Sequence, residues 1–350
     1  MPTALIIESN SYNPWHNLAL EEYIMHKMPD NDSVALYLWQ NQNTVVIGRN
    51  QNAWAECRTG LLEDEGGRLA RRTTGGGAVF HDLGNLNFSI ILPEKIFDLD
   101  NSFNVVLSAV RDSGIDAERS GRNDILYQGA KFSGNAFRID KGFGLHHGTL
   151  LVNSAYERVA RYLTVSPSKL AAKGIQSVRS RIVNLQSIKP DITTEDLKSA
   201  MTDAFLRHFC GYQDTSAQNA SDQLKIVRLT DQDYNKDPSF RKIEERFASW
   251  EWRYGQSICF DAEIEQRFDW GMARLGLVVR QGIVESAALY SDALDSDLIS
   301  SLPELLVGVR FISADLAAVL QSCNYAEGGY GVPRLKMIND LSSWIQQQSW

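Results

Sequence analysis

Cysteine is scarce in this sequence, and its four copies, Cys57, Cys210, Cys259 and Cys323, lie far apart. They form no CxxC pair and no spacing typical of metal ligands, which argues against a zinc site or a redox motif. The sequence therefore predicts reduced, mostly buried thiols.

Long hydrophobic runs and an excess of basic charge are also lacking. No stretch approaches the roughly 18 consecutive apolar residues of a membrane span. The N-terminal MPTALIIESNSYNPW has neither the basic start nor the apolar core of a signal peptide. The net charge is -8 and the pI is about 5.4, whereas a general nucleic-acid binder needs a broad basic surface. We expect a cytoplasmic protein that binds neither membranes nor nucleic acid, so any anionic ligand must be bound locally.

The patterns that are present are typical of a globular α/β protein of the α+β kind. Hydrophobic periodicity predicts helices that begin at Pro14, cover 102–114 and begin again at Thr193, where Thr193 and Asp196 have capping-box spacing. Because strands outnumber the helices that connect them, we expect a mixed sheet with helices packed on it. The extended segments are predicted at 34–39, 44–49, 78–82, 86–92, 131–139 and 145–153.

The pattern of predicted strands and helices changes near residues 239–257. Three further strands are predicted after this segment, and helices follow from about Asp295 to the end. We therefore expect a small α+β unit and place the domain boundary near 250, which gives a large domain at 1–250 and an accessory domain at 251–350.

Three consecutive glycines, Gly75 to Gly77, follow a short strand that ends in Arg71 and Arg72. The run is not a Rossmann fingerprint or a Walker loop, because it precedes a strand and lacks both spacings. It predicts either an anion-binding loop, with the two arginines able to fork onto phosphate or carboxylate oxygens, or a hairpin with surface arginines. The run alone does not decide between them.

A second polar and glycine-rich stretch, GRNDILYQGAKFSGNAFRIDKGFGLHHGTLLVN, covers residues 121–153. Lys131, close to Ser133 and Gly134, could place a cation where a transferring phosphoryl group gains negative charge. Taken alone, the lysine is better explained as a solvated surface ammonium.

Taken in order, several segments resemble the lipoate-protein ligase A family. They are PWHNLALEEYI, TVVIGRNQN, RRTTGGGAVFHDLGN, GRNDI, KFSG, GFGLHHGTLLVN, KLAAKGIQSVRSRIVNL and SWEWRYGQ. The resemblance covers the first 250 residues nearly continuously. It implies that the large domain has the fold of biotin and lipoate ligases and class II synthetases.

The resemblance also implies a reaction. The enzyme would join free lipoate to AMP with release of pyrophosphate, and then pass the lipoyl group to one lysine of an acceptor protein. The expected acceptors are apo lipoyl domains of 2-oxoacid dehydrogenase E2 subunits and the glycine cleavage H protein. ATP, Mg²⁺ and lipoate would be substrates, with no tightly bound prosthetic group.

Site residues follow from the same resemblance. It implies that Lys131 contacts both the lipoyl carboxyl group and the α-phosphate, and that Asp124 contacts magnesium, although Asp124 could equally be structural. His146 and His147 are expected to be hydrogen-bonded strand residues, because lipoate arrives as a carboxylate and needs no base. The nucleotide-binding set is Arg72, Gly77, Ala78, Val79, Phe80 and Lys131; the lipoate-binding set is Lys131, Gly76 and His81; Asn85 and Asn123 lie in matching stretches.

Two positions depart from the family pattern. The chain between Asp124 and Lys131, ILYQGA, is shorter than expected, and Asn135 stands where a small residue usually follows the Ser-Gly pair. The alignment of Lys131 is unaffected.

Two other functions share this pattern. An octanoyl or lipoyl transferase of the same fold would use a cysteine as acyl carrier, but no cysteine occurs between Cys57 and Cys210, which favours adenylation. A non-catalytic lipoate carrier would bind ligand without releasing pyrophosphate.

Two further expectations concern docking and water exclusion. The basic stretch 166–190, with Arg179 and Arg181, docks an acidic acceptor, binds pyrophosphate or is a solvated face, and we expect the docking role. The C-terminal unit from about 255 is expected to act as a lid or brace that changes orientation once the adenylate forms and shields it from water.

Overall fold

The computed structural model describes residues 3–29, 32–164, 182–211, 225–254, 261–322, 332–348 and 350. The chain folds into two compact units. The larger unit contains residues 1–46, 57–70 and 79–249, and the smaller unit contains residues 47–56, 71–78 and 250–350. Two short segments from the N-terminal part of the chain, including the triglycine, therefore fold with the C-terminal part.

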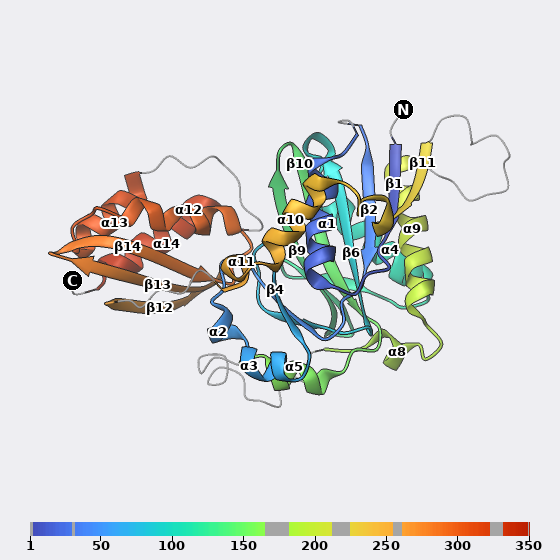
Figure 1. The fold of residues 1–350 in the computed structure, drawn as a ribbon, viewed down its shortest axis with the longest axis horizontal. Helices are drawn as coiled ribbons and strands as arrows, with labels where there is room; N and C mark the ends of the chain where they lie inside the picture. The colour runs from blue at the N-terminus through green and yellow to red at the C-terminus, as the bar shows by residue number, and fades with distance from the viewer. Residues whose placement is uncertain are drawn as a thin grey trace. The chain divides into compact units, whose positions relative to one another are not determined.

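An eight-stranded sheet forms the centre of the larger unit, in the order β11-β1-β2-β6-β10-β9-β8-β7 (Figure 1). β1 pairs in parallel with β2 and β11, and the other neighbours pair antiparallel, so the predicted mixed sheet is confirmed. The strands are β1 (Thr3–Glu8), β2 (Val34–Trp39), β6 (Asn85–Pro93), β7 (Glu118–Ser120), β8 (Asp124–Tyr127), β9 (Ala130–Asp140), β10 (Phe143–Leu151) and β11 (Lys225–Thr230).

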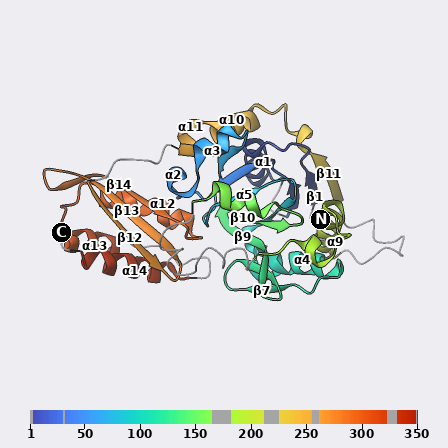
Figure 2. The same cartoon turned by 90° about the horizontal axis from the view of Figure 1, so that it is seen from below.

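Helices cover both faces of this sheet. Figure 2 shows α1 (Pro14–His26) and α10 (Pro238–Ala248) on one side, and α4 (Leu99–Asp112) and α9 (Thr194–Cys210) on the other. α1 begins with Pro14 after an Asn13 cap, and α9 begins with the predicted Thr193–Asp196 capping box. Both predicted helix starts are thus confirmed.

A small sheet in the order β4-β3-β5 carries the strands that flank the glycines. The strand predicted over 44–49 is shorter than expected and ends at Ile47, and a Cβ atom on the next residue, Gly48, would lie 2.1 Å from the Gly76 carbonyl oxygen. These strands are β3 (Thr44–Ile47), β4 (Arg68–Arg71) and β5 (Val79–His81). The remaining short helices are α2 (Ala53–Glu56), α3 (Thr59–Asp64), α5 (Tyr156–Tyr162), α8 (Leu185–Ile188), α11 (Trp250–Tyr254), η1 (Glu94–Ile96) and η2 (Asp231–Asp233).

The smaller unit has the predicted α+β composition. Its antiparallel sheet β12-β13-β14 packs with three helices around an apolar core that includes Leu275, Leu277 and Ile299. The elements are β12 (Ala262–Phe268), β13 (Gly271–Arg280), β14 (Ile283–Ser291), α12 (Ser296–Leu306), α13 (Ser313–Ser322) and α14 (Arg334–Gln346).

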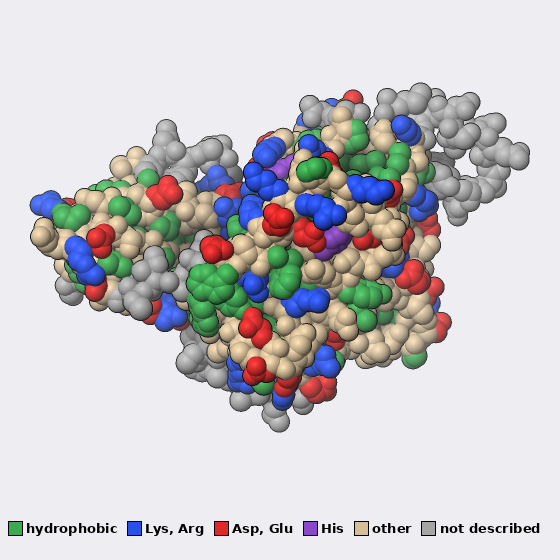
Figure 3. Space-filling view, in the orientation of Figure 1, with side chains coloured by type: hydrophobic (Ala, Val, Ile, Leu, Met, Phe, Trp, Pro, Cys, Tyr) green, Lys and Arg blue, Asp and Glu red, His purple; other side chains and the backbone are tan. Residues whose placement is uncertain are grey.

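Within the described ranges, none of the helices combines the length and the apolar character needed to cross a bilayer. Acidic and basic side chains are interspersed over the face of the larger unit drawn in Figure 3.

Candidate active site

The β8–β9 hairpin carries the residues around Lys131. Gln128 and Gly129 form its two-residue turn and have φ values of 48° and 80°, as a tight hairpin turn requires. Tyr127 faces Ala130 across this turn, so the two strands begin pairing at once. The short connection noted in the sequence is therefore a tight hairpin that brings Asp124 and Lys131 together.

Lys131 forms an ion pair with Asp124 across the hairpin. The distance from Lys131 Nζ to Asp124 Oδ1 is 2.6 Å, and both side chains are about one-third exposed, at 34% and 36%. Gly134 lies opposite Asp124, and a Cβ atom there would come within 3.0 Å of Lys131 Nζ, so the glycine leaves room for the lysine side chain. The Lys131 carbonyl accepts a hydrogen bond from the Val183 N–H at 2.9 Å. The result is a fixed, accessible cation.

The three glycines meet three different requirements. A Cβ atom on Gly75 would lie 2.1 Å from the Ala293 carbonyl oxygen, so this residue is set by close packing within the smaller unit. Gly76 has a φ of +92° and donates its N–H to the same carbonyl at 3.1 Å. Around Gly77 a Cβ atom would meet nothing within 4 Å. Of the three, Gly77 is the one with space for a ligand beside its backbone.

Arg71 is neither an anion ligand nor a surface arginine, the two alternatives that the sequence left open. Its buried guanidinium donates to five backbone carbonyls, of Gly48, Arg49, Gln51, Trp252 and Arg253, at 2.6–3.2 Å. Burial lowers its pKa to about 10, which still leaves it charged at neutral pH. Arg71 therefore joins the chain near residue 50 to α11.

Arg72 organises the glycine loop itself. Its guanidinium donates to the carbonyls of Gly75 at 2.7 Å and Gly77 at 2.8 Å, and its side chain is buried. Arg72 thereby fixes the path of the loop on both sides of Gly76. Its contact with a nucleotide stays a prediction.

β5 places Val79, Phe80 and His81 beside β3. Phe80 is buried, with its ring 5.5 Å from that of Tyr162, so any ligand contact at this position would come from its backbone. His81 is buried as well, and its Nδ1 accepts from Asn41 at 3.2 Å. The ligand contacts assigned to these residues from the sequence stay predictions.

A buried polar stripe on the sheet was missed from the sequence. On β6, Asn85, Asn87 and Ser89 point to the same face, and Ser89 donates to Glu21 of α1 at 2.5 Å. His147 binds the same carboxylate through Nδ1 at 2.8 Å. Within the described ranges, Asn85 Oδ1 and Asn87 Nδ2 are buried and have no hydrogen-bond partner. The signal in the sequence was the polar alternation in NLNFSI.

The described cysteines are poor nucleophiles. Burial raises the pKa of the Cys57 thiol to about 12, and burial likewise raises that of Cys210 to about 11. Cys259 and Cys323 lie outside the described residues, as do residues 166–181 of the basic stretch, which include Arg179 and Arg181.

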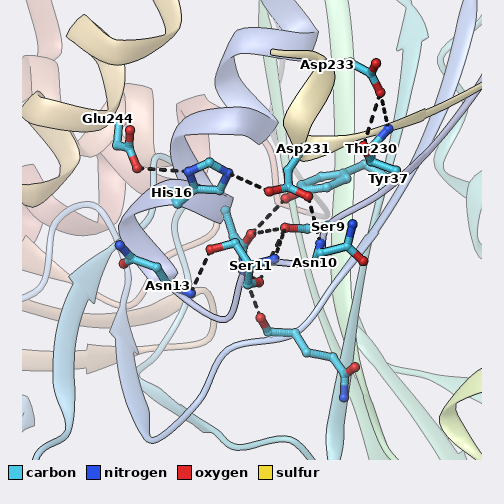
Figure 4. Close-up of polar contacts among 12 residues, drawn as sticks. Ser9, Asn10, Ser11, Asn13, His16, Tyr37, Thr230, Asp231, Asp233 and Glu244 are labelled. Atoms are coloured by element: carbon cyan, nitrogen blue, oxygen red, sulfur yellow. Dashed lines mark hydrogen bonds and ion pairs between the residues drawn. The ribbon is translucent and has the colours of Figure 1, made fainter. Parts of the chain in front are cut away.

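Another cluster of ionisable groups surrounds His16 of α1 (Figure 4). His16 Nδ1 lies 2.9 Å from Glu244 Oε1, and Nε2 lies 3.5 Å from Asp231 Oδ2. The Ser9 hydroxyl donates to Asn17 Oδ1 at 2.6 Å rather than to His16, so this is no Ser-His-Asp triad. The cluster joins α1 to α10 and η2.

Comparisons with known proteins agree with the sequence resemblance. Residues 13–206 match the family described as "Lipoyl protein ligase A/B catalytic domain", and residues 257–345 match "Bacterial lipoate protein ligase C-terminus". A curated relative, lipoate-protein ligase A of Psychrobacter cryohalolentis, is 40% identical over 341 residues, which cover 97% of each chain.

Solved structures show the same fold. LipL1 of P. falciparum, in complex with lipoate, has a TM-score of 0.82 and 28% identity, over 99% of this chain and 100% of that one. A lipoate-protein ligase A bound with ATP has a TM-score of 0.59 and 24% identity, over 73% of this chain and 99% of that one. A bi-partite ligase of Thermoplasma acidophilum, analysed with its E2 lipoyl domain, has a TM-score of 0.61 and 24% identity, over 75% of this chain and 100% of that one.

Proposed function

The chain belongs to the lipoate-protein ligase A family, and we propose that this enzyme attaches lipoate in two steps driven by ATP. In the first step a carboxylate oxygen of lipoate attacks the α-phosphorus of ATP, and the bond to pyrophosphate breaks. In the second step a deprotonated acceptor lysine attacks the carbonyl carbon of lipoyl-AMP, and AMP leaves. The observation that carries the proposal is the accessible Lys131 ammonium, held 2.6 Å from Asp124.

Lys131 is proposed to stabilise charge rather than to form a covalent bond. Its ammonium neutralises the attacking carboxylate and the developing phosphoryl charge, and Asp124 keeps the side chain in place before substrates arrive. The hydrogen bond from the Val183 N–H to the Lys131 carbonyl fixes the main chain at this position, and the ion pair with Asp124 holds the ammonium.

The nucleotide is proposed to lie along the loop that Arg72 organises. Gly77 has the space for close approach, and Ala78, Val79 and Phe80, which lead into β5, are proposed to complete the nucleotide site. Gly76 and His81, with Lys131, are proposed to contact lipoate. The related ligases solved with ATP and with lipoate support these two substrates.

Magnesium is proposed to enter with ATP, where it would neutralise phosphate charge. No group of three His, Cys, Asp or Glu side chains converges on a metal position within the described ranges. Asp124 fits an ion that takes one carboxylate from the protein and the rest of its ligands from phosphates and water. A tightly bound prosthetic group is not part of the proposal.

The acceptors are proposed to be apo lipoyl domains of E2 subunits and the glycine cleavage H protein. The enzyme is proposed to act in the cytoplasm, with neither nucleic acid nor a membrane as a partner. The archaeal ligase analysed with its E2 lipoyl domain supports this partner class. We further propose residues 1–250 as the substrate-binding domain and 251–350 as the accessory domain, in line with the two family matches.

The first half-reaction is tested by lipoate-dependent exchange of labelled pyrophosphate into ATP. The Lys131→Ala variant should lose roughly a hundredfold or more in exchange rate, the usual cost of removing one preorganised charge. Lys141→Ala, at the turn that follows β9, is the matched control and should keep the wild-type rate. Lipoate binding without exchange would instead indicate a carrier, and an unaffected Lys131→Ala variant would remove the lysine from the mechanism.

A further inference from the structure

His146 of β10 lies in a closed aromatic pocket and is fully buried. Its ring centre lies 4.8 Å from those of Phe103 and Phe137 and 5.3 Å from that of Phe88. Burial, together with the electrostatic effects of His147 and Arg119, lowers the pKa of His146 well below its usual value. The imidazole is therefore neutral, with one nitrogen that donates and one that accepts.

The partner of His146 is Asn135 of β9, and the geometry fixes which nitrogen donates. His146 Nε2 lies 2.9 Å from Asn135 Oδ1. The Asn135 amide nitrogen donates to the Asn123 carbonyl at 3.1 Å and to Ser133 Oγ at 3.2 Å, so the amide oxygen must face the histidine. His146 Nε2 consequently carries the proton. Its Nδ1 has no hydrogen-bond partner within the described ranges.

Gly148 makes this contact possible. It faces Asn135 in the register of β9 and β10, and a Cβ atom on Gly148 would lie 2.4 Å from Asn135 Oδ1. The glycine leaves the space in which the amide reaches diagonally toward His146.

Asn135 in turn holds the start of the β8–β9 hairpin. Its backbone N–H donates to the Asn123 carbonyl at 2.9 Å, and Asn123 Nδ2 donates back to the Asn135 carbonyl at 3.1 Å. The next residue after Asn123 is Asp124, the partner of Lys131. Hydrogen bonds therefore link the buried imidazole to Asn123, and the peptide bond from Asn123 to Asp124 links Asn123 to the lysine ion pair.

We propose that His146 is a positioning residue for lipoate adenylation, acting through Asn135 on the Asn123–Asp124 end of the hairpin and so on Lys131. The inference rests on the proposed function. His146 contacts no substrate, and its hydrogen bond selects one orientation of the Asn135 amide. Loss of that bond lets the amide turn, which removes one of the three hydrogen bonds between Asn135 and Asn123 and loosens the ion pair that orients the lysine.

Pyrophosphate exchange in a set of single and double variants tests the inference. His146→Leu and Asn135→Ser should each lower kcat about tenfold with unchanged KM for lipoate and ATP, within the hundredfold that a misplacement of about 1 Å can cost. The double variant should be no slower than either single one, because both break the same chain. His146→Gln, whose amide can donate from nearly the same place, should recover kcat to within about threefold of the wild type.

His16→Gln is the matched control, because it makes the same exchange at another buried imidazole of the larger unit and should leave kcat unchanged. Additive losses in the double variant, an unrecovered His146→Gln, or losses in KM instead of kcat would overturn the inference. If His146→Leu does not fold, the Asn135→Ser and His146→Gln variants carry the same test.

Long-range ¹H–¹⁵N spectra of the imidazoles separate this inference from the proposed function. The wild type should show His146 with the proton on Nε2, and Asn135→Ser should change that signal. A proton on Nδ1 would contradict the proposed chain even in an active ligase. Absence of exchange in a wild type with the expected spectrum would instead contradict the ligase function.

Discussion

At the scale of single residues, the glycines give the sharpest expectation. Gly75→Ala places a Cβ atom 2.1 Å from the Ala293 carbonyl oxygen and should lower the free energy of unfolding by about 1–3 kcal/mol, as overpacking usually does. Gly77→Ala meets no atom within 4 Å and should leave stability within about 0.5 kcal/mol, while raising KM for ATP. Thermal unfolding and steady-state kinetics of the two variants check both effects. Equal stability losses in the two variants would contradict the assignment of Gly75 to close packing and of Gly77 to ligand approach.

The sequence could predict the positions of these residues but not their individual roles. Lys131 and the triglycine could be identified from the sequence, because each lies within a short motif of neighbouring residues. Neither alternative considered for Arg71 was right, since its carbonyl partners in Trp252 and Arg253 lie about 180 residues away in the chain. The packing of Gly75 against Ala293 is non-local in the same way.

At the scale of elements, α3 and α5 are joined by an acid-sensitive contact. Glu65, which ends α3, accepts hydrogen bonds from Arg161 and Tyr162 of α5, and these hold its pKa at about 2. The contact therefore adds stability above the ordinary glutamate pKa of about 4.5, and the contribution is lost as the pH falls toward 2.

Hydrogen exchange of the α5 amides measures this contact. Glu65→Gln should reduce protection of α5 at pH 7, and the difference from the wild type should shrink as the pH falls from about 5 toward 2. A difference that is the same at pH 7 and pH 3 would show that the carboxylate charge is not responsible.

Elements with clear local signals were predicted correctly, and those without them were missed. α9 has its capping box, and β2, β6 and β10 have strong hydrophobic runs. β11 was missed because KIVRLT is a largely exposed edge strand without the alternation of a half-buried one. Its parallel pairing with β1 comes from residues more than 200 positions away.

At the scale of the whole molecule, the units do not follow the order of the chain. Residues 71–78 fold with the C-terminal part, where Gly76 donates to the Ala293 carbonyl and Arg71 donates to those of Trp252 and Arg253. A chain truncated after Ser249 should therefore lose adenylate formation itself, by roughly a hundredfold, because the glycine loop loses its support.

Single-turnover measurements of adenylate formation and hydrolysis test the truncation. If the C-terminal unit acts only as a lid, the truncated chain should form adenylate at nearly the wild-type rate and should lose it to hydrolysis faster than the wild type. Unchanged formation and unchanged protection would contradict both the support of the loop and the lid.

The central claim is ATP-driven lipoylation through Lys131, and the mass of an acceptor protein tests it most directly. Purified enzyme is incubated with ATP, Mg²⁺, lipoate and an apo lipoyl domain, beside the Lys131→Ala variant. The mechanism predicts addition of one lipoyl group to the acceptor, which requires ATP and is lost in the variant. Transfer without ATP from an acyl-carrier donor would contradict it and would indicate a transferase.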